Sequence, residues 1–168
     1  MCTVSAVAPL LTVEEALARV LARIRPLPAE SVSLEDAAAR VLAEDARAAI
    51  DLPRFPSSAM DGFALRSADT PGTLPVVGRI AAGRPVERAL APGEAMGIAT
   101  GGVVPDGADA VVPIERVDEQ DGAVVVPERA PVGINVRPRG GDVEEGAVAL
   151  SAGTVLSPAR LAALAAGG

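Results

Sequence analysis

The chain has 168 residues, 15 basic and 22 acidic side chains, a net charge of −7 and a hydrophobic fraction of 49%. It contains no His, Lys, Tyr or Trp, which excludes a histidine base, a zinc–histidine site, a Schiff-base lysine and the lysine of a Walker loop. The acidic balance argues against nucleic-acid and anionic-membrane surfaces, no apolar run reaches the roughly 20 residues of a membrane span, and we expect a cytoplasmic location. The single cysteine, Cys2, supplies neither a disulfide framework nor a CxxC motif.

The first elements in chain order are predicted to be helical. Thr12 and Glu15 form a capping-box pattern ahead of apolar residues at helical spacing, and this predicts a helix that Pro26 ends. A second helix is predicted over residues 34–43, with Ser33 as its N-cap. The prolines that follow then indicate an extended path into a loop.

The middle of the chain reads as β-structure. Short, Val-rich runs occupy residues 75–80, 95–99, 110–114 and 123–126, and Pro-Gly, Asp-Gly and Gly-Gly turn signals separate them. This spacing predicts a small sheet or barrel. Ser157 as N-cap and Pro158 at the first helical position then predict a closing helix.

Helical ends around a β-rich middle indicate an α+β fold that is mainly β. We expect both helical ends to form one elongated domain, with a β-rich, barrel-like domain inserted between them. The boundaries assigned are residues 1–50 plus 136–168 for the discontinuous domain and 51–135 for the inserted domain.

Small polar side chains gather in three glycine-supported stretches, residues 53–65, 99–115 and 135–146. Glycine allows backbone conformations that present such groups in loops. Because the chain lacks His and Lys, its chemistry must use carboxylates, hydroxyls, arginine and backbone amides. That inventory suits the metal-assisted handling of an oxyanion or a phosphate, in which carboxylates hold the cation and arginine or amides hold the anion.

The polar residues in these three stretches also have a purely structural interpretation. Asp61 precedes a glycine in a common turn dipeptide, and Asp142 follows a Gly-Gly pair that often forms a turn. Thr100, which precedes two glycines, is consistent with a strand end followed by a bend. On residue type alone, both interpretations stay open.

Three other charged residues lie in or beside these stretches. We interpret Asp106 and Asp109 as closing the turn over residues 105–107 rather than as binding a metal. Arg54 either binds phosphate or screens the nearby carboxylates, and the sequence does not choose between the two.

The stretches PRFPSSAMDGFAL, ATGGVVPDGADAVVPIE and NVRPRGGDVEEG, in this order, resemble the N-terminal half of MoeA, the molybdopterin molybdenumtransferase of molybdenum-cofactor biosynthesis, and of its relative, the E domain of gephyrin. The resemblance also takes in LEDAAARVLAED and the closing GTVLSPARLAALAAGG. The family usually has Gly at the position of Ala39 and Glu at that of Gly141. The resemblance implies a homodimer. It also implies an α/β domain and a C-terminal β-barrel, which are absent from this chain.

The implied reaction is a magnesium-dependent hydrolysis of adenylylated molybdopterin with transfer of molybdate to the dithiolene. Molybdopterin adenylyltransferase is the implied donor of the pterin substrate. The family motifs assign catalysis to Asp61, Thr100 and Asp142, metal binding to Asp61 and Asp142, and substrate binding to Ser58, Gly101 and Arg137. The alternative is a non-catalytic module for dimerisation and partner binding, and the choice between molybdenum and tungsten stays open.

Overall fold

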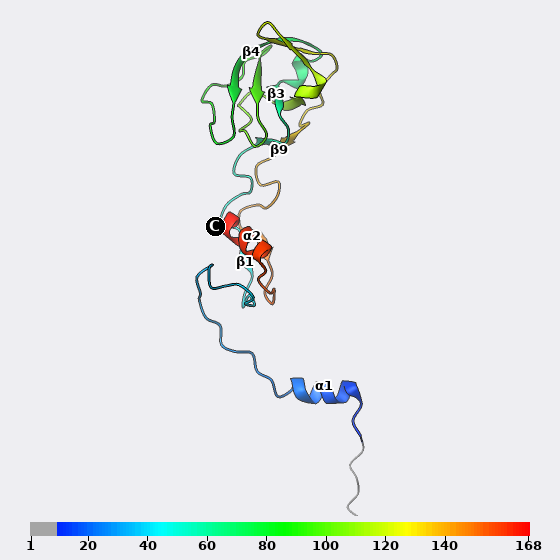
Figure 1. The fold of residues 1–168 in the computed structure, drawn as a ribbon, viewed down its shortest axis with the longest axis vertical. Coiled ribbons are helices and arrows are strands. Elements are labelled where there is room, and N and C mark those ends of the chain that lie inside the picture. Colours follow the sequence, from blue (N-terminus) through cyan, green and yellow to red (C-terminus); the bar gives the residue numbers. More distant parts are fainter. Residues whose placement is uncertain (1–9) are drawn as a thin grey trace, which may run out of the picture. The chain divides into compact units, whose positions relative to one another are not determined.

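The computed structural model describes residues 10–168, so Cys2 lies outside the described residues. The chain divides into two units, residues 1–32 and 33–168. In the first unit, α1 (Val13–Leu21, blue in Figure 1) begins with the predicted capping box: the Thr12 hydroxyl accepts from the Glu15 amide at 3.2 Å, and the Glu15 carboxylate accepts from the Thr12 amide at 3.0 Å. The helix ends at Leu21, earlier than the proline that was expected to end it.

The helix predicted over residues 34–43 is wrong. The segment forms separate turns, and Ala39 has a φ of 63°, in the left-handed region that interrupts a right-handed helix. Its backbone instead pairs with the distant segment 153–156: the Ala39 amide donates to the Leu156 carbonyl at 2.9 Å, and the Leu42 amide donates to the Thr154 carbonyl at 3.0 Å. Tertiary pairing has overridden helical periodicity at this place.

A six-stranded sheet forms the β-rich middle. Its strands lie in the order β6-β3-β5-β4-β8-β7, and only β4 and β5 pair in parallel. The strands are β3 (Gly62–Leu65), β4 (Gly72–Ile80), β5 (Ala95–Ile98), β6 (Ala110–Pro113), β7 (Asp118–Gln120) and β8 (Ala123–Val126), with 3-10 turns at η1 (Ser67–Asp69) and η2 (Ile114–Arg116). The sheet curls into a half-barrel (Figure 1).

The sheet buries side chains on both faces. Phe63 and Leu65 pack on one face with Leu74, Val112 and Val124, which belong to one core cluster. The residue between them, Ala64, points to the other face, where a second cluster contains Ile80, Met96, Ile98 and Val111. The alternation follows from the two-residue period of a strand.

Segments from both ends of unit 33–168 pair beneath the sheet. Strand β1 (Ala46–Arg47) pairs with β10 (Val148–Leu150), and β2 (Ser57–Ser58) pairs with β9 (Val136–Arg137). The last helix, α2 (Pro158–Gly167), begins at the predicted N-cap Ser157, and its Gly167 carbonyl accepts from the Ala49 amide at 2.8 Å. The α+β, mainly β class is therefore confirmed. In the described part of the chain, no helix is long and apolar enough to cross a bilayer.

Candidate functional site

The side chain of Ser58 stabilises the turn between β2 and β3, which carries Asp61. Ser58 is 1% exposed, and its hydroxyl donates to the Met60 carbonyl at 2.5 Å and accepts from the Met60 amide at 3.2 Å. Serine side chains commonly stabilise such turns by hydrogen bonding to the backbone of the residue two positions later. Ser58 therefore shapes the loop from inside, and its hydroxyl does not face solvent.

Asp61 and Thr100 are joined by two hydrogen bonds. The Oδ1 atom of Asp61 accepts from the Thr100 amide at 2.7 Å and from the Thr100 hydroxyl at 2.8 Å. Both residues are exposed, and the second carboxylate oxygen of Asp61 has no hydrogen bond to a described residue. The pair therefore presents one oriented, available carboxylate oxygen at the surface.

The pKa of Asp61 lies below the usual aspartate value because of these bonds. The backbone amide of Thr100 lowers it most and the Thr100 hydroxyl lowers it further, while partial desolvation opposes both. Asp61 is consequently a carboxylate at neutral pH. This charge state suits a cation ligand and does not suit a general acid.

Strand β2 connects the three glycine-supported stretches. On one side, the Gly101 amide donates to the Ser58 carbonyl at 2.8 Å and the Ser58 amide donates to the Gly102 carbonyl at 2.9 Å. On its other side, Ser58 pairs with Val136 and Ser57 pairs with Arg137 in β9. A two-residue strand thus sits between the Thr100 loop and the Arg137 segment. The structure places the three glycine-supported stretches next to one another along β2.

Gly101 supplies backbone geometry to this arrangement. Its φ is 78°, a backbone conformation that residues with a side chain rarely adopt. In this conformation its amide donates to the Ser58 carbonyl.

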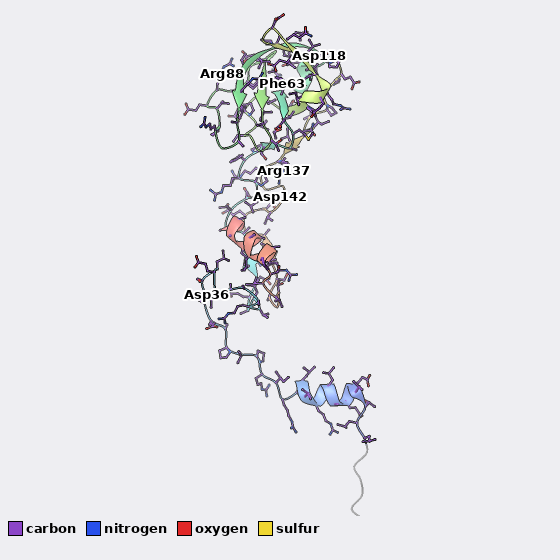
Figure 2. The ribbon with its side chains drawn as sticks, in the orientation of Figure 1. Asp36, Phe63, Arg88, Asp118, Arg137 and Asp142 are labelled. Carbon is purple, nitrogen blue, oxygen red and sulfur yellow. The ribbon has the colours of Figure 1, made fainter. Side chains whose placement is uncertain are left out.

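Arg137 and Asp142 form an ion pair at the other edge of β2. The Arg137 guanidinium lies 2.5 Å from Oδ2 of Asp142, and the two side chains are 49% and 55% exposed. The backbone amide of Asp142 donates to the Leu52 carbonyl at 2.9 Å, which ties this loop to the segment that precedes β2. Figure 2 shows the two labelled residues close together below the sheet. About half of the Arg137 side chain stays exposed to solvent, so it is accessible to an anion.

Asp51 was not found from the sequence, although it organises the same loop. Its Oδ1 atom accepts from the Glu145 amide at 2.8 Å, and its Oδ2 atom accepts from Arg139 at 2.6 Å. The Glu145 bond, followed by the Arg139 bond, holds the pKa of Asp51 below the usual range. Its partners lie 88 and 94 positions away, so no local pattern marks it.

The two aspartates interpreted as structural have structural places. The Ala108 amide closes the turn on the Pro105 carbonyl at 3.1 Å, and the Asp106 carbonyl accepts from Leu90. The side chain of Asp109 accepts from the Ser67 amide at 2.6 Å, across 42 positions of sequence. Backbone atoms therefore close the turn, and the Asp109 side chain bonds a distant segment instead, which corrects the interpretation that these two aspartates close it.

The donor set limits how a magnesium ion could bind. Among the described residues, no group of three or more His, Cys, Asp or Glu side chains is placed to hold a metal ion. Asp61 and Asp142 each have one oxygen engaged, by Thr100 and by Arg137 respectively. Mg²⁺ commonly takes one or two protein carboxylates and completes its shell with water and substrate phosphates. The residues present fit that mode, with Asp61 as the better oriented ligand.

A family model described as the MoeA N-terminal region, domain I and II, matches residues 11–168. The chain belongs to this family. It is 40% identical over 144 residues to a molybdopterin molybdenumtransferase of Synechococcus elongatus, covering 81% of this chain and 36% of the relative. It is 37% identical over 160 residues to that of Haemophilus influenzae, covering 93% and 40%.

Solved structures of a molybdopterin biosynthesis MoeA protein from Pyrococcus horikoshii have the same fold. One superimposes with a TM-score of 0.79 at 36% identity, covering 83% of this chain and 38% of that one. A second gives 0.78 at 33% identity, covering 95% and 43%. The chain thus spans about two fifths of the length of the relatives that it matches.

Proposed function

We propose that this chain is the N-terminal part of a molybdopterin molybdenumtransferase, in which it supplies one wall of the site where adenylylated molybdopterin is hydrolysed and molybdate is transferred to the dithiolene. The observation that carries the proposal is the position of β2 between the Asp61–Thr100 pair and the Arg137–Asp142 pair. One wall then offers carboxylate oxygens to a cation and a guanidinium to a phosphate or oxyanion.

Asp61 and Thr100 act as one unit in this proposal. The Thr100 hydroxyl donates a hydrogen bond to Asp61, so towards any other group its oxygen can act only as an acceptor. Such a hydroxyl suits a water molecule better than a bare anion. Asp61 would hold Mg²⁺ directly or through water, and the ion would supply charge neutralisation to the phosphate oxygens.

Arg137 and Asp142 form the second unit. Arginine carries five N–H donors in a fixed plane, and the single bond to Asp142 leaves most of them for a phosphate. Asp142 orients the guanidinium and keeps one carboxylate oxygen for the cation or for water. The amide of Gly101 is already bonded to Ser58, so both residues would support substrate by shaping the Thr100 loop.

The domain organisation is part of the same proposal. Residues 1–50 with 136–168 would form the dimerisation domain, and residues 51–135 the inserted one. Support comes from the pairing of β1 with β10 and of residues 39–42 with 153–156, which joins the two ends of unit 33–168. A homodimer, magnesium and molybdopterin adenylyltransferase as donor are expectations carried by the family resemblance, and a cytoplasmic location is the expectation drawn from the sequence.

The test is to measure the rate of metal insertion by the protein that the complete reading frame encodes, with adenylylated molybdopterin, magnesium and molybdate. Asp61→Asn and Asp142→Asn should each lower the rate by about 10- to 1,000-fold with little change in melting temperature, because both side chains are exposed. Asp106→Asn is the matched control, since its exposed side chain makes no hydrogen bond to another described residue. Full activity in both test variants would overturn the assignment.

The second candidate is a non-catalytic dimerisation and partner-binding module. It predicts that residues 1–168 release no AMP from adenylylated molybdopterin and that the complete reading frame releases none either. The enzyme proposal predicts no AMP from residues 1–168 alone, because the chain has no lysine for a pterin phosphate, but robust release by the complete protein. Robust release by residues 1–168 would contradict both.

A further inference from the structure

Three residues on adjacent strands form a row across the sheet. In the β3–β5 register Phe63 lies opposite Gly97, and in the β5–β4 register Gly97 lies opposite Arg79. A Cβ at position 97 would lie 2.8 Å from Nη1 of Arg79 and 3.1 Å from its Cγ. The missing side chain of Gly97 therefore lets Arg79 lie flat across β5 towards Phe63.

The guanidinium of Arg79 is held on two sides. Its central carbon lies 5.9 Å from the centroid of the Phe63 ring, within the range of a cation–π contact, and its Nη2 pairs with Glu119 on β7. The N–H donors lie at the guanidinium edge, so the bond to Glu119 leaves the planar face free to stack. The side chain is nevertheless 64% exposed, which means that the orientation is fixed while much of the group stays accessible.

Arg79 borders a hollow of about 300 Å³ that also reaches Asp61. The remaining lining is mostly apolar: Phe63, Ile80 and Ile98 are buried, and Ile114 is 54% exposed. A guanidinium face, an apolar floor and a carboxylate at the edge suit a flat ring with N–H groups on its rim. The ring would stack on the open face of Arg79 beside Ile114, with its N–H groups towards the edge that carries Asp61.

We propose that this hollow, named here the Arg79 hollow, binds a planar nitrogen heterocycle of the substrate, with Arg79 as a stacking and positioning residue. The inference rests on the proposed function, because the adenylylated pterin substrate carries two such rings, an adenine and a pterin. Both rings share the chemistry described above.

The isoleucines provide a direct test. Three of the six in the chain line the Arg79 hollow, namely Ile80, Ile98 and Ile114, while Ile24, Ile50 and Ile134 do not. Residues 1–168 with ¹³C-labelled isoleucine methyl groups should be titrated with millimolar AMP in one arm and pterin-6-carboxylate in the other. We expect methyl shifts confined to the three hollow isoleucines in at least one arm, and the arm that responds identifies the ring.

Variants separate stacking from charge. Arg79→Ala should weaken binding by about 2- to 5-fold, which corresponds to an exposed cation–π contact, and Arg79→Lys should not restore it, because lysine lacks the planar face. Gly97→Ala should weaken it as well, since the added Cβ displaces the guanidinium. Arg84→Ala is the matched control, at an exposed arginine outside the hollow. The methyls of Ile50 and Ile134, which belong to the same unit as the hollow but do not line it, report whether each variant is folded.

The inference is overturned if neither ring shifts the hollow isoleucines, if the shifts centre on Ile134, or if Arg79→Ala binds as the wild type does. In the complete protein, Arg79→Ala should raise KM for the adenylylated pterin with little change in kcat, whereas Asp61→Asn should lower kcat. A normal KM in Arg79→Ala together with an inactive Asp61→Asn would contradict the ring-binding proposal and leave the proposed function intact. Normal turnover in both Asp61→Asn and Asp142→Asn would sink the proposed function.

Discussion

One carboxylate oxygen of Asp61 accepts both hydrogen-bond donors of Thr100, its amide and its hydroxyl, across 39 positions of sequence. The backbone bond is the larger cause of the lowered pKa of Asp61, and the hydroxyl bond is the smaller. Because only the second of these depends on the side chain at position 100, a substitution there can separate the two effects.

Thr100→Val should raise the pKa of Asp61 towards the ordinary aspartate value without reaching it, since the Thr100 amide bond remains. A ¹³C titration of the Asp61 carboxyl carbon would measure this. Thr73→Val, at an exposed position of β4, should leave the Asp61 titration unchanged. An unchanged titration in Thr100→Val would mean that the hydroxyl bond does not form in solution.

Ala39→Gly should stabilise the protein by about 0.5–1 kcal/mol, because a φ of 63° is strained for alanine and not for glycine, and this gain exceeds the entropy that glycine loses on folding. Urea denaturation of both proteins would measure the difference. The neighbouring Ala38→Gly lacks the positive φ, and we expect it to be neutral or destabilising. Destabilisation by Ala39→Gly would contradict the left-handed conformation.

Gly62→Ala should destabilise the fold by about 1–3 kcal/mol through overpacking. A Cβ at this position would lie 2.1 Å from the Val112 carbonyl oxygen, so β6 would have to move away from β3. Gly78→Ala on β4 meets no atom within 4 Å, and we expect it to change stability by less than about 1 kcal/mol. Equal melting temperatures for the two variants would show that β6 yields without cost.

Asp51 should make the stability of the fold depend on acid pH. Its pKa is lowered in the folded state, so its bonds to Glu145 and Arg139 stabilise the fold above the unfolded-state pKa, and this contribution is lost as the pH falls through the folded-state value. Asp51→Asn should therefore flatten the loss of stability measured by urea denaturation from about pH 6 to about pH 3. Asp118→Asn, on the exposed strand β7, is the control and should keep the wild-type slope. A wild-type slope in Asp51→Asn would contradict this role.

The sequence predicted best what local chemistry decides. The capping box of α1 and the Ser157-Pro158 start of α2 depend on neighbouring residues, and both helices are present. The Val-rich run 123–126 coincides with β8. The three polar loops could be identified because clusters of glycine and small polar residues are unusual in core segments.

The errors and omissions arise where distant segments decide the structure. Residues 34–43 have helical periodicity, but hydrogen bonds to residues 153–156 and the conformation of Ala39 prevail. Strand β7 has the sequence Asp-Glu-Gln, which carries no strand signal and is stabilised by its pairing with β8. The row of Phe63, Gly97 and Arg79 depends on strand register, which no sequence pattern specified.

The two residues of β2, Ser57 and Ser58, contact both halves of the proposed site. A substitution in the Thr100 loop or beside Asp142 would disturb mainly its own half, because each lies on one flank of the strand. A change at Ser57 or Ser58 would disturb both halves at once and alter the distance between Asp61 and Arg137. In the proposed site, the spacing between the two halves is thus set by two buried serines that need never touch the substrate.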